Sequence, residues 1–396
     1  MRELHNQDIV CISSVDWEPL WTRKQQVMWR LPKTNRILYV EPPVSLLSPF
    51  KDPARWGKWK LWFQGIRRLN ENIYLLSPPV TLPFGNIYPA VNRFNQWLVA
   101  GAVRRAMRRL GFTRPVLWTY LHNSAHLAGK LGEKLLVYDC VDEHSAYQGF
   151  NPEAVKAMER KLLGQCDLVF VTARGLYEDK KDYCREMYLS PNAADVRHFM
   201  KADDEATPVA EDIQQLPHPV LGFVGAIKEW IDLDLIKFLA ENKPECSVAM
   251  VGPVGLDVDV KPLAALPNVH FLGGKPKEVL PRYLKAFDVC LNPFRQTELT
   301  RTVSPLKFYE YLASGRPIAS VPMPEIEGFA DVVEFGAGRE GFLQAVERAL
   351  QDTPEKKQRR LARAMENSWE SRVAFMMDKI ARKLEHVEPQ MHADER

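Results

Sequence analysis

The segment SPLKFYEYLASGRP, which begins at Ser304, places a lysine and a glutamate three positions apart near the start of a predicted helix. Ser304 is a favourable N-cap, the proline after it suits the first helical position, and Gly315 favours the end of the helix. Lys307 and Glu310 share one side of such a helix. Because backbone N–H groups at a helix start attract anions, we predict that Lys307 contacts a phosphate and Glu310 the hydroxyls of the adjoining ribose. The alternative is a surface helix with an ordinary Lys–Glu pair.

A second group of candidate anion-binding residues follows two predicted strands. Gly225 in FVGAIKEWID lets a ligand approach the backbone, and Lys228 lies in the same strand-to-helix loop. The alternative for Lys228 is an ordinary loop lysine. VGPVG at 251–255 ends another strand and is a weaker candidate for the pocket lining. No G-x-G-x-x-G follows the first strand of either half, which argues against an NAD-type dehydrogenase.

Acidic residues cluster after a strand in the first half of the chain, in VYDCVDEH at 137–144. Asp142 and Asp139 are the candidates for a catalytic base that accepts a proton from an attacking hydroxyl, with His144 placed to tune one of them. A helix cap in a solvated acidic loop is the alternative. Asp142 is the first choice and Asp139 the second.

A third candidate group follows the first predicted strand, in SSVDWEPLWTRKQQ. Asp16 or Trp17 is placed to meet an acceptor, with Arg23 behind them. Trp17 is equally compatible with the domain core, because the chain has ten tryptophans and one of them alone is not distinctive.

The first 110 residues are basic, with 17 lysines and arginines against 7 acidic residues, although the net charge of the chain is only +3. Tryptophans alternate with basic residues in PARWGKWKLWFQGIRR, and VRRAMRRLGF adds an arginine cluster. Indole rings favour the lipid–water interface, and clustered cations favour anionic lipid. This composition therefore predicts a protein face that binds the surface of an anionic membrane. The predicted surface residues are Trp56, Trp59, Trp62, Arg104, Arg105 and Arg108. A basic solvated face is the alternative; a nucleic-acid partner is not expected, because no recognition motif is present.

Short β-rich runs alternate with helix-length segments along most of the 396 residues, which predicts α/β domains with mostly parallel sheets. An acidic, proline-rich stretch interrupts the alternation. The predicted domains are 1–205 and 219–365, joined by a linker at 206–218 and followed by a helix at 366–396 that packs back on the first domain. Ligands of such sheets bind beyond the carboxyl ends of the strands, so we expect a site in a cleft that the two domains face.

No apolar run is long enough to span a membrane, and the N-terminus lacks the pattern of a signal peptide, which predicts a cytoplasmic protein. The six cysteines form no C-x-x-C pair, so we expect buried reduced thiols rather than a metal or redox site.

The second half, with GAIKEWID, VGPV, NVHFLGGKP, DVCLNPF and SPLKFYEYLASGRPIASV in that order, resembles GT-B glycosyltransferases of the family 4 type. The first half, with ILYVEPP, VYDCVDEHSAY, DLVFVTARGLYEDK and SPNAADVRHF, is similar to bacterial teichuronic acid biosynthesis glycosyltransferases. The resemblance implies two Rossmann-like domains, with Glu310 on the ribose and Lys307 and Lys228 on the diphosphate. Many family members carry a glutamate eight residues before the ribose glutamate, where this chain has Thr302, which leaves the stereochemical outcome open.

The resulting expectation is an enzyme that moves a sugar from a nucleoside diphosphate sugar, with UDP favoured, to a lipid-linked or polymeric glycan in cell-wall or exopolysaccharide synthesis. It would work at the inner face of the cell membrane. No cofactor or essential metal is expected, because two lysines and a helix start neutralise the diphosphate. A nucleotide-sugar epimerase and a non-catalytic nucleotide-sugar-binding subunit are the alternatives.

Overall fold

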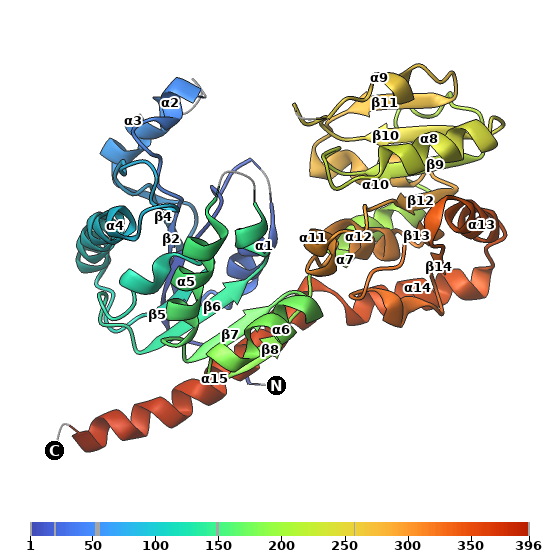
Figure 1. Cartoon of the computed structure of the whole chain (residues 1–396). Coiled ribbons are helices and arrows are strands. Elements are labelled where there is room, and N and C mark those ends of the chain that lie inside the picture. The colour runs from blue at the N-terminus through green and yellow to red at the C-terminus, as the bar shows by residue number, and fades with distance from the viewer. Residues whose placement is uncertain (1, 20, 52–55, 148–149, 257, 395–396) are drawn as a thin grey trace. The chain divides into compact units, whose positions relative to one another are not determined.

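A computed structural model describes residues 2–19, 21–51, 56–147, 150–256 and 258–394. The chain forms two compact units, shown in Figure 1: unit 1 comprises residues 1–191 and 373–396, and unit 2 comprises residues 192–372. Each unit is built around one sheet with its own hydrophobic core.

Unit 1 contains an eight-stranded sheet in the order β3-β4-β2-β1-β5-β6-β7-β8, parallel except for β3. Its strands are β1 (Asp8–Ile12), β2 (Arg36–Val40), β3 (Ile66–Arg68), β4 (Ile73–Leu76), β5 (Val116–Thr119), β6 (Leu135–Cys140), β7 (Leu168–Val171) and β8 (Met187–Leu189). Its helices are α1 (Arg23–Arg30), α2 (Ser48–Lys51), α3 (Trp56–Gln64), α4 (Pro89–Leu110), α5 (Pro152–Leu163) and α6 (Arg174–Lys180).

Helices cover both faces of this sheet. One face buries alternate strand residues such as Val10 and Leu38 in the core that includes Val103 of α4 and Leu162 of α5. The side chains at the intervening strand positions lie on the other face, where Asp139 of β6 accepts a hydrogen bond from Arg23 of α1. Because side chains alternate across a strand, β-rich runs without a polar face indicate strands buried on both sides.

Unit 2 contains a fully parallel six-stranded sheet in the order β11-β10-β9-β12-β13-β14. Its strands are β9 (Val220–Val224), β10 (Ser247–Val251), β11 (Val269–Gly273), β12 (Val289–Asn292), β13 (Ile318–Ser320) and β14 (Glu334–Phe335). Its helices are α7 (Val196–Phe199), α8 (Leu233–Asn242), α9 (Lys261–Ala264), α10 (Leu280–Leu284), α11 (Glu298–Arg301), α12 (Leu306–Ser314), α13 (Gly338–Leu350) and α14 (Pro354–Glu366). The final helix is α15 (Trp369–Asp394), which belongs to unit 1 from Val373 onward.

The predicted linker at 206–218 packs on unit 2. Ala210 and Ile213 are buried in the core of that unit, and the Asp212 carboxylate lies 2.6 Å from Lys275 Nζ. The prolines and most of the acidic residues of the segment occupy its surface, which is why the composition resembles a linker. The compact units therefore divide after Pro191 rather than after residue 205.

Candidate functional site

The helix that carries the predicted phosphate and ribose contacts is α12. It begins at Leu306, with Pro305 as its N-cap residue, and no side chain caps it. The predicted capping role of Ser304 is therefore wrong: its Oγ accepts a hydrogen bond from the Asn192 N–H at 3.0 Å, and its carbonyl accepts one from Asn192 Nδ2 at 2.8 Å. Because the Ser304 side chain is used to hold the loop, the backbone N–H groups of the first turn of α12 are left without a side-chain cap.

Lys307 and Glu310 form an ion pair on α12, with 2.7 Å between Nζ and Oε2. Glu310 is 6% exposed, whereas Lys307 is partly exposed. Burial of the carboxylate limits its conformations and makes its pairing with a donor group favourable. When a ligand binds, the contact between the two side chains can therefore be replaced: Lys307 can bind a phosphate, and Glu310 can accept hydrogen bonds from hydroxyl groups.

Two glycines bring the ends of β9 and β10 close to this pair. The Gly225 N–H donates to the Val251 carbonyl at 2.9 Å, and a Cβ added at Gly252 would lie only 1.7 Å from the Gly225 oxygen. A Cβ at Gly225 would lie 3.7 Å from Lys307 Cγ. The loops after two neighbouring strands and the first turn of α12 thus meet at the carboxyl edge of the sheet, where parallel sheets bind ligands.

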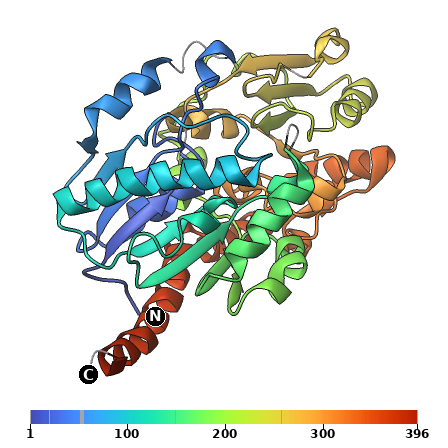
Figure 2. The same cartoon turned by 60° about the vertical axis from the view of Figure 1, so that its left-hand side comes forward.

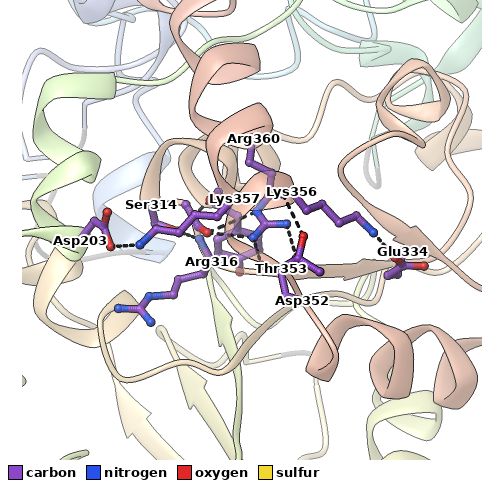
Figure 3. Close-up of polar contacts among 11 residues, drawn as sticks. Asp203, Ser314, Arg316, Glu334, Asp352, Thr353, Lys356, Lys357 and Arg360 are labelled. Atoms are coloured by element: carbon purple, nitrogen blue, oxygen red, sulfur yellow. Dashed lines mark hydrogen bonds and ion pairs between the residues drawn. The ribbon is translucent and has the colours of Figure 1, made fainter.

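Further contacts hold α12 at its second half and just beyond its last residue. The Val224 N–H at the end of β9 donates to the Tyr311 hydroxyl at 2.8 Å. Gly315 ends the helix, as predicted; it adopts the left-handed conformation with φ of 70°, and its carbonyl accepts hydrogen bonds from the buried Arg360 guanidinium. Figure 3 shows that Arg360 is in turn paired with Asp352. These contacts fix the orientation of the helix that carries Lys307.

Lys228 also lies near the end of β9, in the turn closed by the bond from the Ile231 N–H to the Lys228 carbonyl. Its side chain is exposed, with Nζ 5.2 Å from the centre of the Trp230 ring. This is a weak cation–π contact, which costs little to break when a stronger anion binds.

In unit 1, Asp139 is fully buried at the end of β6. Arg23 Nε donates to both of its carboxylate oxygens, at 3.0 and 2.9 Å, and the Arg23 guanidinium also donates to Ser190 Oγ at 3.1 Å. Neither side chain is more than 1% exposed. A carboxylate in this position is inaccessible to an acceptor hydroxyl, so the observed contacts favour a structural role for Asp139 and Arg23.

Asp142, two residues after the same strand, is only partly buried. Burial and the adjacent Asp142 carboxylate, to which the Tyr147 hydroxyl is hydrogen-bonded, raise the pKa of Tyr147. Lys24 lies near Asp142: burial lowers the pKa of this lysine, and the Asp142 charge opposes that shift. The carboxylate is thus accessible and faces a buried cation.

Two histidines that contact each other lie beside this acidic loop. The His122 and His144 ring centroids are 4.7 Å apart. Burial lowers the pKa of both rings, for His122 to about 3. Within the described residues, both ring nitrogens of His122 and Nδ1 of His144 lack a hydrogen-bond partner. The sequence interpretation missed His122 and Lys24; the position of His122 just after β5 was the available signal.

Of the predicted acceptor contacts, Trp17 is 1% exposed and packs edge-on against Tyr39 at 4.9 Å. It belongs to the core, as the alternative interpretation held. Asp16 is partly exposed, and its carbonyl accepts a hydrogen bond from Gln25 Nε2 at 2.7 Å. Asp16 therefore has an accessible side chain, whereas Trp17 does not.

The predicted membrane-surface residues lie on α3 and α4. Trp56 and Trp62 are 46% and 39% exposed, Trp59 is partly buried, and the three arginines of α4 are exposed. Residues 53–55 of the predicted segment lie outside the described residues. No helix in the described part of the chain combines the length and apolar character that crossing a bilayer requires.

Comparison with known proteins bears on the site of unit 2 directly. The sequence profile of a family described as "Glycosyl transferases group 1" matches residues 218–367, which include β9, β10 and all of α12. Unit 2 is a group 1 glycosyltransferase domain. The family resemblance and the enzyme class expected from the sequence are confirmed for this domain.

The chain is also similar to one curated protein, the putative teichuronic acid biosynthesis glycosyltransferase TuaH of Bacillus subtilis (strain 168). The two are 28% identical over 232 residues, which make up 54% of this chain and 58% of TuaH. The matched region thus spans less than two thirds of the relative.

Solved structures establish the fold of this chain over nearly its full length. Sucrose-phosphate synthase (tll1590) from Thermosynechococcus elongatus matches with a TM-score of 0.68 and 15% identity, covering 96% of this chain and 99% of that one. Anabaena Alr3699/HepE in complex with UDP and glucose matches with a TM-score of 0.61 and 12% identity, covering 95% and 99%. Together with the two parallel α/β sheets, these matches confirm the predicted GT-B fold class.

Proposed function

We propose that this protein transfers a sugar from a UDP-sugar to a lipid-linked or polymeric glycan in cell-wall or exopolysaccharide synthesis. The observation that carries the proposal is the Lys307–Glu310 pair on α12, next to the glycine contact between Gly225 and Gly252. The similarity to TuaH supports a cell-envelope acceptor, and the UDP complex of the Anabaena protein supports uridine as the nucleoside of the donor.

Unit 2 binds the donor in this proposal. The diphosphate lies against the uncapped start of α12 and draws Lys307 away from Glu310, while Glu310 accepts hydrogen bonds from the ribose hydroxyls. Lys228 adds a second positive charge from the turn after β9. Charge on the departing diphosphate is then stabilised by groups already in place, which lowers the barrier to transfer.

Unit 1 binds the acceptor. Asp142 is the group that accepts a proton from, or orients, the attacking hydroxyl, because it is partly exposed, whereas the neighbouring Glu143 is paired with Lys180 at 2.6 Å. Asp139 and Arg23 position this loop from beneath and do not touch the substrate. Asp16 lies after β1 on the same carboxyl edge of the sheet, where it can contact the acceptor.

The enzyme works at the inner face of the cell membrane in this proposal. Helix α4 supports it, because Phe94, Trp97, Arg104, Arg105 and Arg108 fall within one stripe of the helix surface. Phe94 and Trp97 are 44% and 62% exposed and their rings contact each other at 5.8 Å. Aromatic rings followed by arginines on one exposed stripe match the interfacial and headgroup layers of an anionic bilayer.

The test measures donor binding and turnover together. A thermal-shift series with UDP-, GDP- and ADP-glucose should give the largest stabilisation with the UDP-sugar, by about 2.7 kcal/mol at a hundredfold excess over Kd. Wild-type protein should hydrolyse the UDP-sugar slowly, and Lys307→Ala and Glu310→Ala should abolish both readouts. The matched control is Lys237→Ala, which removes an exposed i,i+4 pair with Glu241 on α8.

Three outcomes would contradict the proposal. Equal hydrolysis by wild type and both site variants would mean that the donor does not bind at α12. Interconversion of nucleotide sugars without an acceptor would indicate an epimerase instead. Binding without any hydrolysis or transfer would indicate a non-catalytic subunit.

A further inference from the structure

A buried ion network in unit 1 reaches the loop that carries Asp142. The Lys180 ammonium, at the end of α6, lies 2.6 Å from Glu143 Oε2 and 2.7 Å from Glu159 Oε2 of α5. The side chains of Lys180, Glu143 and Glu159 are 7%, 15% and 3% exposed. One buried ammonium therefore joins a carboxylate of a helix to a carboxylate of the loop. Figure 2 shows β6, α5 and α6 among its turquoise to green ribbons.

The helix side of this network is joined to β6. Glu159 Oε1 accepts a hydrogen bond from the Tyr138 hydroxyl at 2.7 Å, and Cys140 Sγ lies 3.5 Å from the same oxygen. Cys140 Sγ also lies 3.7 Å from the Asp142 carbonyl oxygen. Because Glu159, Tyr138 and Cys140 belong to a helix and a strand of unit 1, their contacts give the Lys180 ammonium a fixed position.

The loop side of the network is the Glu143 carboxylate, which uses both of its oxygens. Oε1 accepts hydrogen bonds from the Ser145 N–H at 3.2 Å and from the Ser145 hydroxyl at 2.5 Å, while Oε2 is paired with Lys180. Burial raises the pKa of Glu143, but the Lys180 charge and these hydrogen bonds outweigh burial and lower the pKa below its ordinary value. The carboxylate is therefore ionised at neutral pH and is held by charge-assisted hydrogen bonds.

Asp142 lies between two residues that are held in this way. The carbonyl of Val141, before it, accepts a hydrogen bond from the buried Thr172 hydroxyl at 2.7 Å. The residue after it is Glu143, which Lys180 holds. Because the Asp142 side chain is itself partly exposed, the backbone on either side determines where its carboxylate can lie. A displacement of about 1 Å in a group that meets a reacting atom can lower a rate about a hundredfold.

We propose that Lys180 is a positioning residue of the acceptor site, which fixes Asp142 through the Glu143 carboxylate without touching the substrate. This assignment rests on the proposed function, in which Asp142 meets the attacking hydroxyl. Loss of Glu143 leaves Lys180 and Glu159 as a pair of opposite charges, so the fold itself does not require the contact with the loop. The contact is required for the position of the loop.

The test is a double-mutant cycle on hydrolysis of the UDP-sugar, in which water takes the place of the acceptor hydroxyl. Lys180→Met and Glu143→Ala should each lower kcat by about ten- to a hundredfold. The double variant should lower kcat no further, because both changes release the same loop. If Lys180 only supported the fold, its loss would lower kcat in the Glu143→Ala background as well. Stabilisation by the UDP-sugar, which binds unit 2 in the proposed function, should be unchanged in all three variants.

The matched control is Lys181→Met, which removes the next lysine along the chain. The Lys181 side chain is 44% exposed and pairs with Glu178 at the surface, so the variant should hydrolyse the UDP-sugar at the wild-type rate. Lys180→Met leaves two buried carboxylates without their cation and should be less stable in urea than wild type. Glu143→Ala removes the same contact from the loop side and keeps the other ion pair, so it tests the proposal even if Lys180→Met does not fold.

Wild-type hydrolysis by Glu143→Ala, or losses that multiply in the double variant, would overturn the inference. If the wild-type protein binds and hydrolyses the UDP-sugar and Glu143→Ala and Lys180→Met match it, this inference fails alone. If the wild-type protein neither binds nor hydrolyses the UDP-sugar, the proposed function fails.

Discussion

Arg23 Nε donates to both carboxylate oxygens of Asp139 inside unit 1, where neither side chain is more than 1% exposed. The bond joins α1 to the end of β6, and the Arg23 guanidinium extends the network to Ser190 after β8. The two charged residues therefore connect distant parts of the sheet beneath the loop that carries Asp142.

Removal of one member of this pair should be strongly destabilising. Arg23→Met leaves a buried, uncompensated carboxylate, so we expect a loss of about 3–5 kcal/mol in the free energy of unfolding, measured with urea. The double variant Arg23→Met/Asp139→Leu should recover most of it, because neither charge is then buried. A single variant within 1 kcal/mol of wild type would show that the pair is dispensable.

Gly252 should tolerate no side chain. A Cβ there would lie 1.7 Å from the Gly225 oxygen, so Gly252→Ala must displace the loop after β9. We expect lower stability and at least tenfold weaker UDP-sugar binding by calorimetry. Gly328→Ala in the same unit, where a Cβ meets nothing within 4 Å, is the control and should match wild type. Unaltered donor binding by Gly252→Ala would place the donor elsewhere.

The buried His122 ring should make stability depend on pH. Burial and the neighbouring His144 lower its pKa to about 3 in the folded protein, against about 6.5 when unfolded. The unfolded chain binds the extra proton, so stability falls as pH decreases from 6.5 toward 3, by up to about 1.4 kcal/mol per pH unit for this ring. In urea titrations between pH 7 and 5, His122→Leu should show a shallower fall than wild type; an equal fall would assign the effect to other groups.

The exposed stripe of α4 should bind anionic vesicles. Each arginine contributes about 1 kcal/mol near an anionic surface, so Arg105→Ser should weaken binding about fivefold and the triple Arg104/Arg105/Arg108 serine variant about a hundredfold. Trp97→Ser should weaken it further by removing an interfacial ring. Sedimentation with phosphatidylglycerol vesicles measures the effect, with Lys156→Ser on α5 as the control. Equal sedimentation of the triple variant and wild type would argue against this face.

The strand and helix pattern was largely predictable, because hydrophobic periodicity and turn residues are local. The end of the helix that Gly315 was expected to stop coincides with the end of α12. The antiparallel edge strand β3 and the two-residue β14 are not predictable in this way, since such short segments have no period to detect. The packing of 206–218 was missed because it depends on two buried side chains among polar ones.

By itself the sequence determined the alternation of strands and helices and the joint position of Lys307 and Glu310 on one helix, because these depend on periodicity and spacing within single elements. The GT-B class followed from the resemblance of several motifs to a known family. Only the tertiary structure decided which carboxylate is accessible: Asp139 and Asp142 are three residues apart, yet one faces α1 beneath the sheet and the other lies in the loop. A cavity of about 590 Å³ in unit 1 also arises only on folding, since its lining comes from loops and a helix spread over residues 43–150. Burial and cavity shape depend on contacts between distant segments, which no local pattern in a chain records.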